Sequence, residues 1–306
     1  MALAGVEQIN EALATGADIV LAGRATDTAA IAALPLQRGE HAGAAWHGAK
    51  IAECGALCST NPVSGVILLE VDQLGFTVQP MAQGATCTPH SVSAHMLYEN
   101  ADPFLLHEPG GTLDVTDAIY EQVDDRCVRV SGSRWIAADV YTVKLEGARP
   151  TGFQSTILAI LRDTHYVKNA ERWVERLSGF LDNEIATSLQ LHKSDYHIDF
   201  RLIGMNSVLG ELERKSGTPV EVGVLVLVNA ESEEMSEELA KLINPFLLHY
   251  PLTDDEELPT FAFAYSPAQT QRGQFYEFCL NHIIELEHPM EVFSIRSGAE
   301  GLRETG

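Results

Sequence analysis

The stretch 16–27 most constrains how this chain can fold. It contains a short apolar run at 19–22 that ends at a glycine. Such a run predicts a fully buried strand, and Thr26 or Asp27 would then cap an apolar helix at 28–34. In an open α/β sheet, a strand, a tight loop and a helix N-terminus form a site at the carboxyl end of the strand.

Arg24 lies in the same loop and makes it the first candidate site. Free backbone N–H groups and the helix dipole favour an anion at a helix start, and a guanidinium adds a fixed charge. We therefore predict that Arg24, Thr26 and Asp27 bind a substrate carboxylate or phosphate. The alternative is that Arg24 pairs with a surface carboxylate and that Asp27 only caps the helix.

A helix is predicted at 6–13, directly before this stretch, because apolar residues recur there with helical spacing and Gly16 follows. A parallel sheet needs a strand before that helix, and only residues 1–5 precede it. We therefore expect the chain to begin within a larger α/β fold. The early strand should belong to a mainly parallel or mixed sheet, and the chain should be a homo-oligomer that covers the exposed sheet edge.

The charge balance limits the partners. With 43 acidic and 20 basic residues, the formal charge is −23, which repels phosphate backbones and anionic lipid surfaces. We expect neither nucleic acid nor membrane as a partner. No signal peptide is visible, and the five scattered cysteines are expected to be free thiols, so the sequence favours a cytoplasmic protein.

Metal and cofactor motifs are absent from the sequence. Cys54 and Cys58 are four residues apart and could share a helix face, but two thiols do not make a zinc site. HExxH, GxSxG and Walker A motifs do not occur. The sequence therefore predicts no metal, and the cofactor remains unknown.

Glu53 is the first candidate for proton transfer. It lies in a segment rich in alanine and glycine, 41–59, that is predicted to be a closely packed helix. A carboxylate among small residues would be partly desolvated, which suits acid or base chemistry. The alternative is a glutamate that faces solvent.

A second helix start follows a hairpin predicted from the β-prone runs 66–71 and 76–78. The loop 83–91 contains hydroxyls and small residues, and Thr86 and Thr88 in it are candidate substrate-binding residues. His90 could act as a general acid or base, or could simply donate a structural hydrogen bond.

Several motifs resemble one protein family. They are the run 17–27, the triplet Glu53-Cys54-Gly55, the loop 88–92, the segment 97–103 and the stretch 128–132. Together, in this order, they resemble the acyclic terpene utilisation (AtuA) family. The resemblance departs at two points, because family members usually carry an α/β segment upstream and a Gly-Gly pair where this chain has Cys87 and Thr88.

The resemblance implies a role in the breakdown of acyclic terpenoids and related branched acids. It points to Arg24, Asp27, Glu53 and Thr88 as functional residues. The substrate would be a small carboxylate or acyl-CoA. Some relatives carry a small C-terminal domain, which could exist here as a separate partner chain.

The chain is predicted to form an α/β (α+β) protein of two domains, 1–150 and 151–306. In the second domain, two successive β-α-β units predict a ferredoxin-like split β-α-β fold, with 150–152 as a hinge. The alternating strands at 196–202 and 220–228 should pair within one sheet. The segment 290–295 is expected to add an edge strand.

Three function classes fit these features. The first is an enzyme acting on a carboxylate or acyl-CoA, with Glu53 and His90 as its catalytic residues. The second is a non-catalytic subunit that supports a partner enzyme. The third is a protein that binds or stores an anionic ligand. Convergence of Arg24, Glu53 and His90 on one cleft would favour the enzyme.

Overall fold

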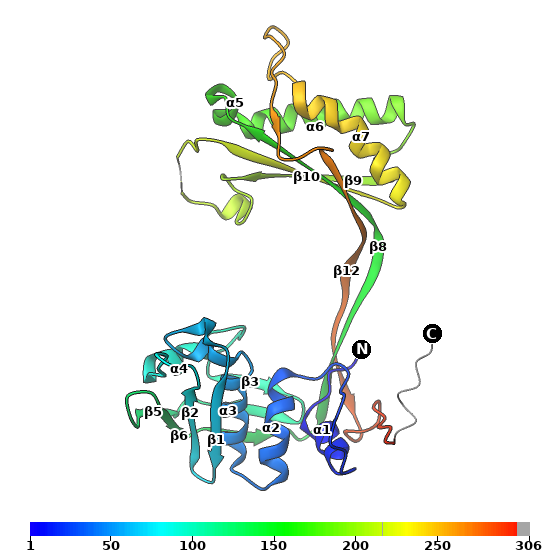
Figure 1. Ribbon diagram of the computed structural model, residues 1–306. Helices are drawn as coiled ribbons and strands as arrows, with labels where there is room; N and C mark the ends of the chain where they lie inside the picture. Colours follow the sequence, from blue (N-terminus) through cyan, green and yellow to red (C-terminus); the bar gives the residue numbers. More distant parts are fainter. Residues whose placement is uncertain (216, 299–306) are drawn as a thin grey trace. The chain divides into compact units, whose positions relative to one another are not determined.

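The chain forms two compact units in the computed structural model, which describes residues 1–215 and 217–298 (Figure 1). The first unit combines Met1–Gly147 with the segment from Cys279 onward, and the second is Ala148–Phe278. The long strands β8 (Tyr141–Leu161) and β12 (Gln269–Leu286) each contribute residues to both units. Both units combine helices with antiparallel sheets, which confirms the mixed α/β (α+β) class.

The helices of the first unit begin where the sequence supplies caps. They are α1 (Val6–Leu13), α2 (Asp27–Gln37), α3 (Ala42–Ala52), η1 (Gly55–Cys58), η2 (Pro62–Ser64) and α4 (Pro89–His95). Thr26 Oγ1 accepts a hydrogen bond from the Ala29 N–H at 3.1 Å, and Thr88 Oγ1 accepts one from the Ser91 N–H at 3.0 Å. The side chains of Thr26 and Thr88 thus satisfy backbone donors that the first helical turn leaves free.

Two antiparallel sheets complete the first unit. Their strands are β1 (Ile67–Asp72), β2 (Gly75–Pro80), β3 (Leu105–Glu108), β4 (Gly111–Asp114), β5 (Ile119–Gln122), β6 (Val128–Ser131) and β7 (Arg134–Ala137). The orders are β1-β2-β6-β5 and β3-β4-β7. The predicted hairpin is confirmed as β1 and β2. Helix α3 packs against both of these strands, and Trp46 and Phe76 are fully buried in the core that they share.

The prediction of a buried strand at 19–22 is wrong. These residues adopt no strand, and the Ile19 and Leu21 side chains are 86% and 95% exposed. The parallel pairing expected here is reduced to one isolated bridge between Ala4 and Ala25. A buried strand requires neighbouring strands and covering helices, and the residues that the structure describes supply neither at this place. The named strands of the first unit pair antiparallel, so the expectation of a mainly parallel or mixed sheet is also wrong.

The second unit is the predicted split β-α-β fold. Its further elements are α5 (Thr164–Lys168), α6 (Ala170–Ser188), β9 (Tyr196–Ile203), η3 (Gly210–Leu212), β10 (Val222–Ala230), α7 (Glu233–His249) and β11 (Ala262–Phe263). The sheet order is β11-β8-β10-β9, with β12 also paired to β8. Strands β9 and β10 pair antiparallel in one sheet, as predicted. Helices α6 and α7 cover one face of this sheet (Figure 1).

Two predicted elements differ from the structure. The segment 290–295 is not a strand, and the long β12 precedes it instead. The helix predicted over 41–59 ends at Ala52, and η1 follows. Gly55 there has a φ of +57°, which interrupts a right-handed helix. In the part of the chain that the structure describes, no helix is long and apolar enough to cross a lipid bilayer.

Candidate functional site

A buried ion pair at the end of α3 is the centre of the candidate site. Lys50 Nζ donates to Glu53 Oε1, and the two side chains are only 8% and 6% exposed. Thr28, in the first turn of α2, donates its hydroxyl to Glu53 Oε2 at 2.8 Å. Both carboxylate oxygens of Glu53 are therefore engaged, which is how a buried charge is tolerated in a protein interior.

Glu108 adds a second carboxyl group to the site. It ends β3, and its Oε2 atom is buried without a hydrogen-bond partner among the described residues. The pKa of Glu108 is raised to about 6, chiefly by burial and also by the negative charge of Glu53. The hydroxyls of Thr26 and Thr28 and the charge of Lys50 act in the opposite direction.

His95 contributes a second polar atom without a partner. It is the last residue of α4, it is 5% exposed, and its Nε2 atom has no hydrogen-bond partner in the described part of the chain. Burial lowers the pKa of His95, whereas the nearby charge of Glu53 raises it. A neutral imidazole can donate or accept one proton, so this side chain can serve a ligand in either way.

The rim of the site contains titratable side chains. Burial raises the pKa of the Cys54 thiol, and the charges of Glu53, Glu99 and Asp27 add to this effect. Buried polar atoms in proteins are nearly always hydrogen-bonded, so the unpartnered Glu108 Oε2 and His95 Nε2 atoms make these two side chains candidates for contact with a ligand or water. Two carboxyl groups with different environments, next to an ammonium, are suited to proton transfer.

The structure brings together part of the predicted set. Thr26 caps α2, and its hydroxyl lowers the pKa of Glu108. Asp27 is an exposed residue of the first helical turn. Arg24 forms a salt bridge with Glu146, with a distance of 3.1 Å from Nε to Oε2. This pair matches the alternative interpretation of Arg24. The described contacts do not join Arg24 to Glu53.

The second predicted loop serves mainly to start a helix. Thr88 caps α4, and the hydroxyl oxygens of Thr86 and Thr60 are 3.2 Å apart. His90 is exposed in the first turn of α4, and its described contact is a carbonyl that accepts from the Ser93 hydroxyl. Within the described residues, helix α4 therefore presents His95 to the site and leaves His90 outside its contacts.

The sequence interpretation missed Lys50, His95 and Glu108. Lys50 could have been found, because it lies three residues before Glu53 in a segment of small apolar residues, where i and i+3 side chains are neighbours. Nothing local to His95 or Glu108 marks them as buried. Their positions depend on the contacts of α4 with η1 and β5 and on the pairing of β3 with β4.

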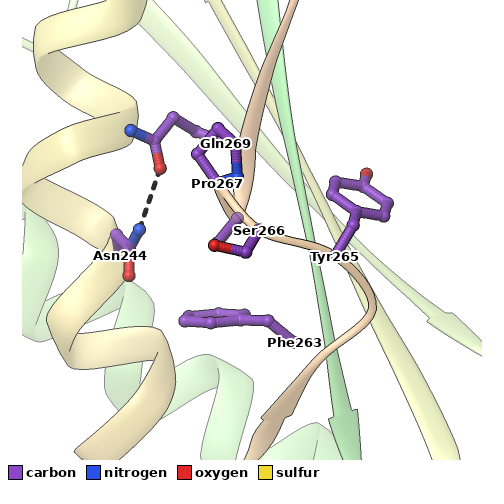
Figure 2. Close-up of a pocket in the computed structure, with 7 residues that line it drawn as sticks. Asn244, Phe263, Tyr265, Ser266, Pro267 and Gln269 are labelled. Carbon is purple, nitrogen blue, oxygen red and sulfur yellow. Dashed lines mark hydrogen bonds between the residues drawn. The ribbon is translucent and has the colours of Figure 1, made fainter.

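The described cavities lie in the second unit. Figure 2 shows one of about 700 Å³, where Asn244 donates to Gln269 at 2.9 Å above the ring of Phe263. A larger cavity of about 910 Å³ lies beside His165 and Glu256, which are 3.2 Å apart. Among residues 1–215 and 217–298, no group of three or more His, Cys, Asp or Glu side chains could hold a metal ion.

Comparisons with known proteins place the chain in a family. No curated protein and no solved structure matches it. The model of the acyclic terpene utilisation family protein AtuA matches residues 1–254, which include every residue of the candidate site. This match covers most of the 306 residues. The chain therefore belongs to the acyclic terpene utilisation (AtuA) family.

Proposed function

We propose that this chain is an enzyme that transfers a proton to or from a small branched carboxylic acid or its acyl-CoA thioester, with Glu108 as the catalytic acid or base. The observation that carries the proposal is the buried, unpartnered Oε2 atom of Glu108, on a carboxyl group whose pKa is raised to about 6. A group with a pKa near the working pH combines a large ionised fraction with useful basicity.

The Lys50–Glu53 pair supports the reacting group. When Glu108 removes a proton next to a carbonyl, negative charge develops on the substrate oxygen. The positive charge of Lys50 acts on Glu108, where it lowers the pKa. Glu53 accepts a hydrogen bond from Lys50 and one from Thr28, which fixes the ion pair in place. A fixed charge in a buried site stabilises developing charge more strongly than water would.

His95 is the second polar group that we assign to the substrate. Because burial favours its neutral form, its Nε2 atom can hydrogen-bond to a carbonyl oxygen without placing a second cation beside Lys50. The free N–H groups at the start of α2, beside Thr26 and Asp27, would favour the carboxylate or thioester end of the substrate.

Deuterium exchange tests the proposed reaction. The protein is incubated with isovaleryl-CoA or isovalerate in D₂O, and deuterium in the recovered acyl group is measured by mass spectrometry. We expect exchange at the carbon next to the carbonyl. Glu108→Gln should reduce its rate by roughly 10²-fold to 10⁴-fold, the usual contribution of general acid–base catalysis. The matched control is Glu121→Gln, the same change at an exposed strand position, which should exchange at the wild-type rate.

The outcome separates the enzyme from its alternatives. If the wild-type protein exchanges deuterium and the Glu108→Gln variant exchanges it at the same rate, Glu108 is not the catalytic group. Binding of isovaleryl-CoA without any exchange, with or without a candidate partner chain, would favour the non-catalytic subunit or the anion-binding protein.

A further inference from the structure

Two buried thiols face each other beside the candidate site. Cys58 ends η1 and Cys87 immediately precedes the cap of α4, and their sulfur atoms are 4.0 Å apart. Both residues are fully buried. Cys58 Sγ also lies 3.7 Å from the Gly55 carbonyl oxygen. A disulfide requires sulfur atoms about 2.05 Å apart, so a shift of roughly 2 Å would join the pair.

We propose that Cys58 and Cys87 form a reversible disulfide bond when the protein meets hydrogen peroxide. The Cys58 thiolate attacks one peroxide oxygen, the O–O bond breaks, and Cys58 becomes a sulfenic acid while hydroxide leaves as water. Cys87 then attacks the Cys58 sulfur, the S–S bond forms, and the sulfenic oxygen leaves as a second water. Two thiols lose two electrons and one peroxide gains them.

Cys58 is assigned as the first nucleophile because of its environment. The hydrogen bond with Cys87 lowers the pKa of Cys58, and it raises that of Cys87. The thiolate is the reactive form of cysteine, so Cys58 is the sulfur that peroxide oxidises first. The hydrogen bond with Cys58, burial and the negative charge of the Cys58 thiolate all raise the pKa of Cys87, so Cys87 reacts second, after oxidation of Cys58 has removed that charge.

The bond would tie together two segments that support the candidate site. Cys58 follows Glu53 closely along the chain, and Cys87 lies next to Thr88, which caps the helix that carries His95. Oxidation would therefore fix the end of the Glu53 segment to the start of α4. A consequence for catalysis rests on the proposed function, but formation of the bond does not.

Peptide mapping of the full-length protein tests the bond. The protein is treated with hydrogen peroxide, free thiols are blocked with N-ethylmaleimide in denaturant, and the chain is cleaved after glutamate. Cleavage at Glu53, Glu70 and Glu99 places Cys58 and Cys87 on the separate peptides 54–70 and 71–99. We expect these peptides to be linked, and the number of free thiols to fall from five to three. Dithiothreitol should restore all five.

Matched variants identify the sulfur atoms. Cys54→Ala should keep the link between the two peptides, which assigns the link to Cys58, the other cysteine of peptide 54–70. Cys279→Ala should also keep the link, because this exposed thiol is not involved. Cys87→Ala should abolish it. Hydrogen exchange should slow at amides near residues 58 and 87 in oxidised wild-type protein only.

Three results would overturn the proposal. They are five free thiols after peroxide treatment, a link from the peptide of Cys87 to the buried Cys127, and oxidation of Cys58 to the sulfinic acid without any link. All three are read on wild-type protein, so a variant that fails to fold does not affect the answer.

Discussion

Thr28 Oγ1 donates a hydrogen bond to Glu53 Oε2 at 2.8 Å, and this contact joins the first turn of α2 to the end of α3. It brings together two sequence segments that were separate candidates for function. The same carboxylate accepts from Lys50, and the Thr28 hydroxyl also acts on Glu108. The Thr28 hydroxyl thus connects the capped helix start with the Glu53 carboxylate, and it also lowers the pKa of Glu108.

Replacing Glu53 by Gln should lower the free energy of unfolding by roughly 3 kcal/mol, because it leaves the Lys50 ammonium buried without its counter-charge. The double variant Lys50→Met, Glu53→Gln should recover most of that loss, since it removes the uncompensated charge and retains an acceptor for Thr28. Urea denaturation followed by tryptophan fluorescence measures both. An equivalent change in the exposed pair of Lys241 and Glu237, Glu237→Gln, should cost less than about 0.5 kcal/mol.

Glu108 should make the stability depend on pH in one specific window. Its folded pKa of about 6 lies above the ordinary value of 4.5, so the folded state binds more protons between these values. Stability should therefore fall as pH rises from about 4.5 to about 6, by about 2 kcal/mol in total, and stay level above that window. The measurement is the difference in unfolding free energy between wild type and Glu108→Gln at each pH. A difference that is constant with pH would contradict the burial of this carboxyl group.

Asp72 should also make the free energy of unfolding depend on pH, in the opposite direction to Glu108 and at lower pH. The bidentate hydrogen bonds from Arg129, at 2.7 and 2.8 Å, lower the pKa of Asp72 to about 2. The stabilisation is complete above about pH 4 and is lost as pH falls toward 2. Asp72→Asn should reduce the loss of stability between about pH 4 and about pH 2. At pH 7 it should lower the free energy of unfolding by on the order of 1 kcal/mol, because the pair lies at the surface. Acid unfolding is measured by circular dichroism. If stability falls between about pH 4 and about pH 2 as steeply in Asp72→Asn as in wild type, Asp72 does not cause this pH dependence.

Gly43 should not tolerate a side chain, because a Cβ there would lie 2.3 Å from the Ser133 carbonyl oxygen. Gly43→Ala should destabilise the protein by roughly 2 kcal/mol or more through overpacking. Gly179→Ala is the matched control within another helix, where nothing lies within 4 Å of the added carbon. It should stabilise by about 0.5 to 1 kcal/mol through helix propensity. Thermal melts of the two variants should shift in opposite directions.

Arg24→Ala should leave the melting temperature nearly unchanged, because the Arg24 side chain is 48% exposed and Lys144 remains to pair with Glu146. If Arg24 also holds the substrate anion, the same variant should bind isovalerate or isovaleryl-CoA more weakly by about 1.5 to 3 kcal/mol. Calorimetric titration measures that loss, and Arg24→Lys should restore only part of it. Unchanged affinity in Arg24→Ala would limit this residue to its pair with Glu146.

The second unit was largely predictable because its signals are local and repeated. In β10, buried and partly buried residues alternate along the whole strand, and β9 pairs with it in one sheet. The periodic apolar residues of α6 and α7 likewise define one covered face. In the first unit, the run 19–22 has the composition of a buried strand but lacks neighbouring strands among the described residues, so composition alone was misleading.

The sequence by itself determined where helices begin and which residues carry charge: Thr26 and Thr88 cap the helices that follow them, and Glu53 lies among small residues as expected. Only the tertiary structure decided which groups share the site. Glu108 and His95 reach it through packing of β3 and α4, elements distant along the chain, and their burial, missing partners and pKa shifts depend on those long-range contacts. Desolvation is a property of the surroundings in space, so neighbouring residues in sequence carry no record of it.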